Sequence, residues 1–331
     1  MALFDLPVAE LERYRPDLPE PVGFAEFWAD TLAEARRHEA LVAVEPVRTD
    51  LALVRSADVT FAGFAGQPVR AWYTRPAGAD GVDLPIVVEY LGYGRGRGLP
   101  HERLVWPCAG YAHLLMDTRG QGSQWGTGGD TPDPVGSGPA APGFVTRGID
   151  DPRQAYLRRL FTDAARAVDA AALLPGVDTE RIAVAGNSQG GGLAIAAAGL
   201  NPRVRALMAS VPFLCHIRRS IDITDADPYA EIVRYLSVHR GVVDQVLTNF
   251  DHFDVVHHAR RTIAAAQFAA GLRDTVCPPS GIYAAFNALG GTDTEIHAYP
   301  FNHHEGGDAL HTARQLAWLA ARFAPVAAMA G

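Results

Sequence analysis

The sequence predicts an α/β fold in which a mostly parallel, twisted sheet is covered by helices on both faces. From residue 85 onward, short apolar segments alternate with segments of helical character. Such alternation is typical of parallel strands that are buried on both sides. The chain has 331 residues, of which 48% are hydrophobic and 20% charged. A chain of this length can bury one large core without disulfides or metals, so we expect a single domain over residues 1–331.

The N-terminal part of the chain is expected to differ from the rest. Apolar residues recur at helical spacing between Phe24 and Ala35, so residues 1–45 predict a helical extension that packs over the main body. Residues 51–76 then become strand-like, with candidate strands at 59–61 and 69–73 on either side of a glycine-containing turn. That arrangement predicts an antiparallel pair at the edge of the sheet.

The rest of the chain follows the alternating pattern. Residues 157–174 form the clearest helical segment, and the glycine- and proline-rich residues 126–143 predict a long loop. Residues 212–262 are helical and polar, with several aromatics, and predict a helical insertion late in the sheet that forms a lid or wall over the site. The strands of the parallel sheet are expected at 85–90, 113–117, 181–185, 204–208, 266–270 and 295–299.

The composition argues against several classes of protein. The formal charge of −8 disfavours a nucleic-acid partner, because neutralising phosphates requires clustered cations. Three widely spaced cysteines, Cys108, Cys215 and Cys277, argue against a disulfide framework and a zinc site. The sequence shows neither a secretory signal pattern nor an uncharged apolar run of about 18 residues, the length that spans a bilayer. We therefore expect a cytoplasmic protein without cofactor or metal that binds neither nucleic acid nor membrane.

Residues Gly186–Gly190 read Gly-x-Ser-x-Gly, with Ser188 at the centre. The pattern alone is common, but here it follows the apolar residues 182–185 and opens a helical segment at Gly191. A nucleophile elbow requires this context, because a tight strand-to-helix turn lifts the serine clear of the sheet. The alternative is a glycine-rich turn before an ordinary helix. The context favours the elbow, and with it the α/β-hydrolase fold.

The carboxylate of a catalytic triad in this fold follows the serine along the chain and precedes the histidine. Asp274 comes directly after the predicted strand 266–270 and is the candidate. Asp251 and Asp254 are weaker candidates, since they lie in the helical insertion. A helix cap or turn is the structural alternative for Asp274.

The general base is expected after the last strand, where His303 and His304 are consecutive. Spacing alone leaves both histidines open. The neighbouring Glu305 raises the alternative of a metal site, but there is no second cluster of ligands and the spacing differs from His-Glu-x-x-His. We therefore interpret this segment as the source of the base.

Several long motifs accompany these residues in a fixed order. They are Gly92-Tyr93 followed by Gly96–Gly98, Asp117–Gly122, the serine motif extended to Gly191, Gly271–Asp274 leading to Cys277–Pro279, and His304–Gly307. Together they resemble the acetyl xylan esterase and cephalosporin-C deacetylase family, carbohydrate esterase family 7. The resemblance covers nearly the whole chain, from Leu3 to the final helix.

The resemblance implies roles for individual residues. It selects His304 over His303 as the base, because the family's histidine directly precedes glutamate. It implies an oxyanion hole formed by the backbone N–H groups of Tyr93 and Gln189. The acyl pocket that it implies is lined by Tyr93, Phe213, Pro228 and Val276.

The implied function is that of a serine esterase. It would remove acetyl groups from acetylated xylo-oligosaccharides or cephalosporin C-like esters through an acetyl-enzyme intermediate. The family resemblance also implies a hexamer that encloses the active sites and admits small, short-acyl substrates. The alternatives are a general short-chain carboxylesterase, a serine peptidase of the same fold and an inactive hydrolase scaffold that only binds. Arg119 is expected to be structural and to pair with a carboxylate or loop carbonyls near the site.

Overall fold

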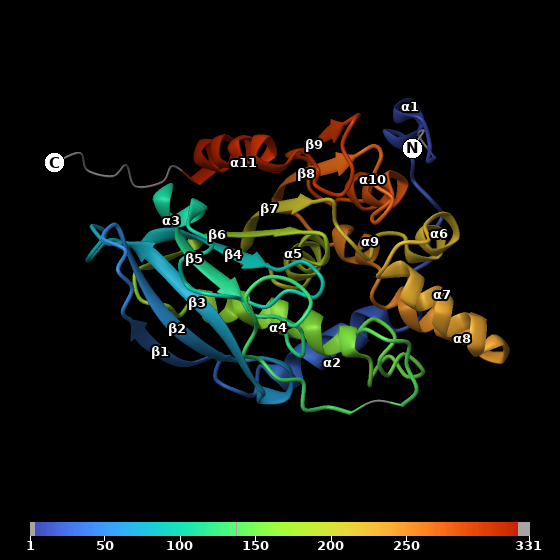
Figure 1. Cartoon of the computed structure of the whole chain (residues 1–331), viewed down its shortest axis with the longest axis horizontal. Coiled ribbons are helices and arrows are strands. Elements are labelled where there is room, and N and C mark those ends of the chain that lie inside the picture. Colours follow the sequence, from blue (N-terminus) through green and yellow to red (C-terminus); the bar gives the residue numbers. More distant parts are fainter. Residues whose placement is uncertain (1–3, 137, 324–331) are drawn as a thin grey trace.

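Nine strands of the described residues form one sheet, in the order β1-β2-β3-β5-β4-β6-β7-β8-β9 (Figure 1). The computed structural model describes residues 4–136 and 138–323. Residues 1–3, 137 and 324–331 lie outside the described residues. The predicted single domain includes all of them, and the predicted N-terminal extension includes residues 1–3. The strands are β1 Leu41–Val47, β2 Val54–Ala62, β3 Pro68–Pro76, β4 Leu84–Tyr90, β5 Ala112–Met116, β6 Val177–Asn187, β7 Val204–Ser210, β8 Ala265–Gly271 and β9 Thr294–Tyr299.

The sheet is antiparallel at one end and parallel over the rest. Strands β1, β2, β3 and β5 pair antiparallel, whereas β5, β4, β6, β7, β8 and β9 pair parallel. The predicted antiparallel pair corresponds to β2 and β3, but its predicted place at the edge is wrong, because β1 pairs with β2 and forms the edge of the sheet. The predicted α/β-hydrolase fold with a mostly parallel sheet is confirmed.

The N-terminal extension is shorter than predicted. Its helices are α1 Val8–Leu11 and α2 Phe24–Ala35, but residues 41–47 form strand β1 instead of continuing the helical segment. The expectation of helix up to residue 45 is therefore wrong at its end. This segment is rich in valine, which favours a pleated strand, and pairing satisfies the backbone groups along the free edge of β2.

Helices cover both faces of the sheet (Figure 1). In Figure 1, α3 and α11 lie above the parallel strands, and α4 and α2 lie below them. The predicted helix at 157–174 corresponds to α4, which ends at Ala171. The helices that follow β4 are α3 Val105–Cys108, α4 Tyr156–Ala171, α5 Gln189–Leu200, α6 Ile217–Ile223, α7 Tyr229–Val238, α8 Val243–Asp251, α9 Val255–Ala259, α10 Pro279–Asn287 and α11 Asp308–Phe323.

The two faces bury cores of different size. Side chains alternate along each strand, so Ile86 and Val88 of β4 join the large cluster under α4 and α5. Val87, between them, joins a smaller cluster with Trp106 of α3 and Leu319 of α11. The apolar runs that predicted these strands are thus buried on both sides.

Four helices, α6 to α9, lie between β7 and β8, within the range of the predicted insertion at 212–262. Figure 1 shows α7 and α8 projecting from one end of the molecule. Helix α9 packs closely on α5, where a Cβ on Gly199 would lie 2.5 Å from the carbonyl oxygen of His258. None of the helices in residues 4–136 and 138–323 is both long and apolar enough to span a bilayer.

Candidate active site

Ser188 occupies the turn between β6 and α5 with φ 57° and ψ −120°. A non-glycine residue rarely adopts this backbone conformation, and it persists only where the surroundings enforce it. The N–H of Ser188 donates to the carbonyl oxygen of Ser210 at 2.9 Å, and its own carbonyl oxygen accepts from the N–H of Phe213 at 2.9 Å. These bonds to β7 and the segment after it hold the turn in place.

Two glycines make this turn possible. A Cβ on Gly186 would lie 2.2 Å from the carbonyl carbon of Gly190, and a Cβ on Gly190 would lie 2.2 Å from the carbonyl oxygen of Tyr90. Any larger residue would therefore push the elbow away from β4. The local glycine pattern is thus a steric requirement of the strand-to-helix turn.

Ser188, His304 and Asp274 form one chain of hydrogen bonds. The Oγ atom of Ser188 lies 2.9 Å from Nε2 of His304, and Nδ1 of His304 lies 2.8 Å from Oδ2 of Asp274. Because an ionised carboxylate only accepts, Nδ1 carries the hydrogen and Nε2 is left to accept the serine proton. Asp274 is fully buried, and its Oδ1 accepts the N–H groups of Val276 at 2.8 Å and Cys277 at 2.9 Å.

The loops after β8 and β9 bring Asp274 and His304 together, although the two residues are 30 positions apart. The N–H of Arg273 donates to the carbonyl oxygen of Asn302 at 3.0 Å. A Cβ on Gly271 would lie only 2.0 Å from the carbonyl oxygen of His303, so glycine is required where the loops cross.

The other candidates for the base and the acid, His303, Asp254 and Asp251, contact partners outside this chain of hydrogen bonds. Nδ1 of His303 donates to the carbonyl oxygen of Arg273 at 2.8 Å, so this ring faces the β8 loop while His304 faces Ser188. Asp254 is the N-cap of α9 and accepts from backbone N–H groups. Asp251 pairs with Arg218 at 2.7 Å. Neither aspartate forms a hydrogen bond with a histidine of the predicted base segment, within the part of the chain that the structure describes.

The two backbone donors suggested for the oxyanion hole come just after the ends of two neighbouring strands, β4 and β6. Gln189 is the first residue of α5, so its N–H has no partner within the helix, and Tyr93 lies in the loop after β4. Gln121 links the two segments: its Oε1 accepts from the N–H of Gly94 at 2.7 Å, and its Nε2 donates to Oε1 of Gln189 at 2.9 Å. Gln121 belongs to the motif Asp117–Gly122, but its linking role was not predicted.

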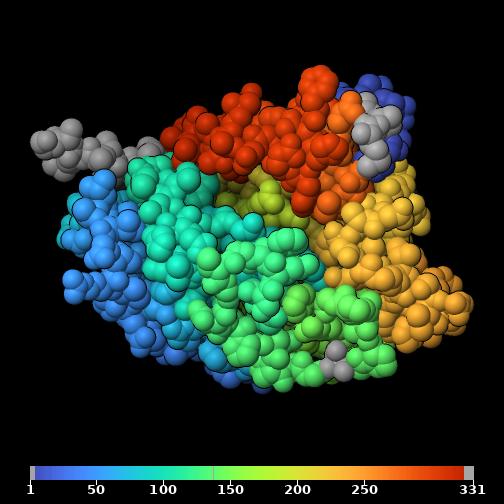
Figure 2. All heavy atoms as spheres, viewed as in Figure 1, coloured from blue at the N-terminus to red at the C-terminus, as the bar shows by residue number. Residues whose placement is uncertain are grey.

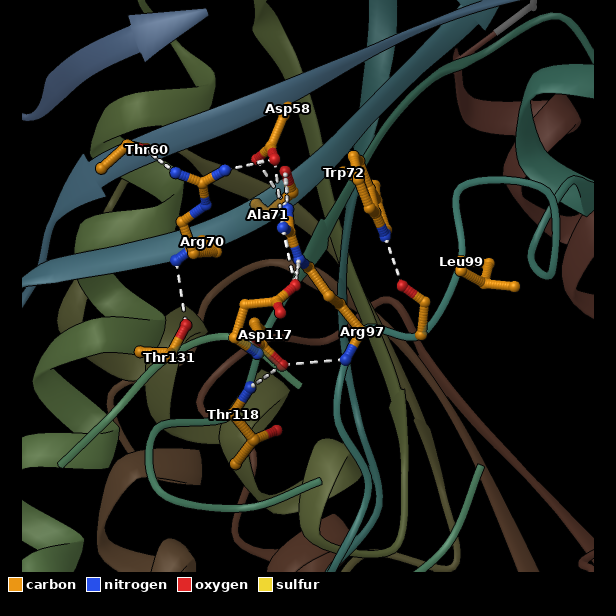
Figure 3. Close-up of polar contacts among 12 residues, drawn as sticks. Asp58, Thr60, Arg70, Ala71, Trp72, Arg97, Leu99, Asp117, Thr118 and Thr131 are labelled. Atoms are coloured by element: carbon orange, nitrogen blue, oxygen red, sulfur yellow. Dashed lines mark hydrogen bonds and ion pairs between the residues drawn. The ribbon is translucent and has the colours of Figure 1, made fainter. Parts of the chain in front are cut away.

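Arg97 anchors the loop that carries Tyr93 to the antiparallel strands (Figure 3). Its guanidinium donates to Asp58 of β2 at 2.7 Å and to Asp130 at 2.8 Å, and it lies 3.9 Å from the ring centroid of Trp72. The backbone N–H of Arg97 donates to Asp117 at 2.8 Å. Burial raises the pKa of Asp58, but Arg97 and its neighbour Arg70 lower it below its usual value overall. The loop is therefore held through both the side chain and the backbone N–H of Arg97.

The four residues that the resemblance assigns to the acyl pocket come from segments that surround the triad. Phe213 is bonded to the elbow through its N–H, and its ring lies 4.5 Å from that of Tyr229. Val276 is bonded to Asp274 through its N–H. Pro228 is buried and directly precedes α7. The structure thus places Phe213 and Val276 in direct contact with triad residues.

The Tyr93 side chain is fixed by a carboxylate that sequence reasoning missed. Its hydroxyl donates to Oε1 of Glu231 on α7 at 2.5 Å, and Oε2 of Glu231 accepts the N–H groups of Phe144 and Val145 at 3.2 Å. Burial raises the pKa of Glu231 despite these bonds, and burial and Glu231 together raise the pKa of Tyr93. In the sequence, Glu231 was one acidic residue among several in a polar helix.

A cavity of about 550 Å³ opens beside His304. Its floor is formed by the ends of β4, β6 and β7, and its walls come from residues 95–106 and 304–315. Figure 2 shows this hollow between the teal segment that precedes α3 and the red segment that begins α11. None of the four predicted acyl-pocket residues lines it.

Arg119 has the structural role that was expected for it. Its side chain is fully buried and donates to both oxygens of Asp163 on α4, at 2.5 and 2.8 Å. Asp133 lies 3.3 Å away and also pairs with Arg159. The partner that the sequence had left unnamed is therefore Asp163.

The elbow, the chain of hydrogen bonds and the sheet together define an α/β-hydrolase. Within that class the chain belongs to the acetyl xylan esterase family, because the family model described as acetyl xylan esterase (AXE1) matches residues 1–322. This family places the chain among the carboxylic ester hydrolases. The resemblance drawn from the sequence motifs is confirmed.

Solved structures of the same family are similar over almost the whole chain. Acetyl xylan esterase from Paenibacillus sp. R4 is 36% identical with a TM-score of 0.90, and the match covers 96% of this chain and 99% of that one. Acetyl xylan esterase 1 from Thermoanaerobacterium sp. JW/SL YS485 is 30% identical with a TM-score of 0.87 over the same shares.

Two further relatives match less completely. Acetyl esterase Axe7A from Xylanibacter ruminicola is 31% identical over 162 residues, which is 49% of this chain but only 36% of that protein's length. An acylaminoacyl peptidase from Pyrococcus horikoshii is 17% identical with a TM-score of 0.58, covering 80% of this chain and 41% of that one. This last likeness shows the fold alone.

Proposed function

We propose that the protein is a serine esterase that removes acetyl groups from small acetylated substrates, such as acetylated xylo-oligosaccharides and cephalosporin C-like esters. The observation that carries the proposal is the continuous hydrogen-bonded chain from Ser188 through His304 to Asp274. Membership of the acetyl xylan esterase family supports acetyl as the acyl group. Ser188 is the nucleophile, His304 the general base, and Asp274 the carboxylate that orients the imidazole.

The first half-reaction forms an acetyl-enzyme. Ser188 Oγ attacks the carbonyl carbon of the ester while Nε2 of His304, 2.9 Å away, takes the hydroxyl proton. The negative charge that develops on the carbonyl oxygen is stabilised by the N–H groups of Tyr93 and Gln189. The tetrahedral intermediate then collapses, the bond to the alcohol oxygen breaks, and His304 gives its proton to that oxygen.

The second half-reaction repeats these steps with water. His304 removes a proton from water, the hydroxide attacks the acetyl carbonyl, and the acetate leaves as Ser188 Oγ regains the proton. Asp274 stabilises the imidazolium that forms twice per cycle. Its remaining oxygen is occupied by two backbone N–H groups, so the carboxylate is held in one orientation throughout.

The oxyanion hole depends on two loops that are fixed in advance. Each backbone donor is expected to stabilise the transition state by about 3 kcal/mol. Gln121 holds the Tyr93 loop against Gln189, and Glu231 fixes the Tyr93 side chain. These bonds support a preorganised site, because the donors need no rearrangement when charge develops.

A pocket formed by Tyr93, Phe213, Pro228 and Val276 would accept a short acyl chain. The buried rings of Phe213 and Tyr229 pack against each other at 4.5 Å, which leaves little freedom to admit a longer chain. A general short-chain carboxylesterase uses the same triad on unrelated small esters, and the chain lengths it accepts distinguish it from a deacetylase.

The test is hydrolysis of p-nitrophenyl acetate beside the butyrate and octanoate esters. We expect rapid acetate cleavage that falls steeply with chain length and is about 10⁶-fold slower in Ser188→Ala. Ser237→Ala, which changes an exposed serine on α7, is the matched control and should keep full activity. Activity that survives Ser188→Ala would overturn the mechanism, while equal rates on octanoate would overturn the preference for acetyl.

We also propose the homo-oligomer that the family resemblance implies, a hexamer. Light scattering on the purified protein should then give a mass six times that of the 35.4 kDa chain. A mass equal to that of one chain would contradict the hexamer without affecting the proposed chemistry.

A further inference from the structure

Glu231 of α7 is a buried carboxylate that joins three separate segments of the chain. Only 3% of the residue is exposed. Its Oε1 accepts from the hydroxyl of Tyr93 in the loop after β4, and its Oε2 accepts from the N–H groups of Phe144 and Val145 in the long loop before α4. Burying a charged group is costly unless hydrogen bonds compensate it, and here three donors from two loops provide this compensation.

The backbone around the carboxylate is shaped for this contact. Glu231 is the third residue of α7, where the positive end of the helix dipole favours a negative charge. A Cβ on Gly143 would lie 2.1 Å from Oε1 of Glu231, so glycine is required where the loop closes on the carboxylate. The N–H of Glu231 donates to the carbonyl oxygen of Pro228 at 3.2 Å. Glu231 therefore contacts two residues of the predicted acyl pocket, Tyr93 and Pro228.

The hydrogen bonds of this cluster require an acceptor at Glu231. The hydroxyl oxygen of Tyr93 accepts from the N–H of Phe144 at 2.7 Å, so its hydrogen is left to donate to Glu231. The three groups bonded to the carboxylate are all donors, and an ionised carboxylate, which only accepts, satisfies them all. A proton on Glu231 would add a fourth donor to the cluster and would leave one hydrogen without an acceptor.

We infer that Glu231 is a positioning residue for the oxyanion hole: its ionised carboxylate holds the Tyr93 side chain, and this side chain keeps the backbone N–H of the same residue in place for the reacting carbonyl. Protonation of Glu231 releases Tyr93 and slows ester hydrolysis. The inference rests on the proposed esterase function and deepens it, because it makes one of the two oxyanion donors depend on a charge carried by the helical insertion.

The groups around Glu231 affect the pH at which this charge is lost. Burial raises the pKa of Glu231, and Asp227, just before α7, also raises it, whereas Tyr93 and the two N–H groups lower it. The loop before α4 contributes Arg147, whose guanidinium lies 4.3 Å from the ring centroid of a neighbouring aromatic residue. Burial and Glu231, together with Tyr156 of α4, raise the pKa of Tyr93. Of the two partners in this hydrogen bond, Glu231 is therefore the one that changes charge below neutral pH.

The test compares the unaltered protein with Glu231→Gln over a range of pH. Glutamine keeps the size of the side chain but places an N–H donor in the cluster, as a proton on Glu231 does. Above neutral pH, kcat/KM for p-nitrophenyl acetate should be lower in Glu231→Gln by up to about 100-fold, the cost of misplacing a catalytic group by about 1 Å. Unaltered activity in Glu231→Gln would overturn the inference.

The decisive readout is the ratio of the two kcat/KM values as pH falls. The unaltered protein with Glu231 protonated has the same pattern of donors as Glu231→Gln, so the ratio should approach one below the pKa of Glu231. Protonation of His304 slows both proteins and cancels in the ratio. A ratio that stays constant with pH would overturn the inference, because a glutamate needed only for folding gives a ratio that does not follow its titration.

A second variant keeps the charge of Glu231 and removes only the hydroxyl that it holds. Tyr93→Phe should lower kcat/KM above neutral pH, and its ratio to the unaltered protein should also approach one as pH falls. The effects of Tyr93→Phe and Glu231→Gln should not add in the double variant, since both break the same bond. Tyr93→Phe keeps the test valid even if Glu231→Gln does not fold, and a pH-independent ratio in this variant would again overturn the inference.

Glu26→Gln is the matched control, because it makes the same change at an exposed residue of α2. Its kcat/KM should equal that of the unaltered protein at every pH. If the unaltered protein fails to cleave p-nitrophenyl acetate in a Ser188-dependent way, the proposed function itself fails. If it cleaves that ester but the ratios stay constant with pH, only the role of Glu231 fails.

Discussion

The two faces of the sheet differ in how far they bury their charged side chains. On the face covered by α4 and α5, Arg119 and Asp163 form an ion pair in which both side chains are 0% exposed. On the face covered by α3 and α11, Arg103 pairs with Glu89 while 39% of the arginine side chain remains exposed. The first pair lies inside the main core, whereas the second lines a cavity of about 550 Å³.

The helices that cover the two faces are buried to different extents. Helix α4 has 16 residues and nearly all of them are buried, so it closes its face. On the other face, α3 has only four residues and α11 buries only five of its 16, and the ends of β4, β6 and β7 line a cavity there. The comparison teaches that one face supplies stability while the other leaves room for a ligand, and that the triad lies at the edge that both faces share.

Among the changes that probe this comparison, the largest effect is expected at that shared edge. Asp274→Asn should lower kcat on p-nitrophenyl acetate by about 10⁴-fold, because an amide cannot hold the imidazole in the tautomer that accepts the serine proton. Asp251→Asn, which alters the carboxylate paired with Arg218, is the control and should retain activity. Full activity in Asp274→Asn would refute its assignment.

Loss of an arginine should lower the free energy of unfolding more on the face covered by α4 and α5 than on the face covered by α3 and α11. Arg119→Met leaves Asp163 as a buried carboxylate without its partner, and such losses cost about 3–5 kcal/mol. Arg103→Met should cost less, because Glu89 keeps its bond to His113 and solvent reaches the pair. Urea unfolding of both variants measures the difference. Equal losses would show that the two pairs are equivalent and would remove the contrast between the faces.

Leucine truncation compares how well the two faces are packed. Leu160 of α4 and Leu319 of α11 are both 0% exposed, so each Leu→Ala change removes the same buried atoms. Such changes cost about 2–5 kcal/mol, with larger losses where the site cannot collapse. We expect Leu160→Ala at the upper end and Leu319→Ala at the lower end, since the smaller core lies next to open space. The reverse order in thermal or urea unfolding would contradict this account.

The smallest expected effect per group is on the pH dependence of stability. Burial lowers the pKa of His258 to about 3 and that of His257 to about 4, both on α9, and it lowers the pKa of His311 on α11 to about 4. Between pH about 6.5, the unfolded value, and these folded values, the unfolded state binds more protons than the native state. The free energy of unfolding should therefore fall as pH falls, by up to about 1.4 kcal/mol per pH unit for each group.

His258→Leu removes one of these groups and should flatten the profile of unfolding free energy against pH between about 6 and 4. The same substitution at exposed His101 is the control. Since His258 lies among the rings of Phe24, Trp28 and Phe161, leucine suits its surroundings. An unaltered slope in His258→Leu would show that this histidine is not buried in its neutral form.

The sequence predicted best those features whose cause is local. Ser188 was predicted as the nucleophile because the strand, the glycines and the helix that make an elbow are adjacent in the chain. The parallel strands were identified because burial on both faces leaves a continuous apolar run. Strand β1 was missed, since its pairing with β2 is decided by an edge 9 to 20 residues away and not by the segment's own pattern.

The sequence by itself determined the fold class, and it predicted a nucleophile and a short set of candidates for the acid and the base. The family resemblance had already favoured His304 over His303, and the order of the elements had favoured Asp274 over Asp254. Only the tertiary structure shows that Ser188, His304 and Asp274 meet, because hydrogen bonds between residues 30 and 116 positions apart are set by packing. The tertiary structure also determines that Glu231 holds the Tyr93 side chain, that Arg119 is fully buried and that Arg103 lines a cavity. The sequence gives the sign of each charge. The exposure of a charged group and its partners depend on which segments fold against each other, and exposure and partners determine the role of the group.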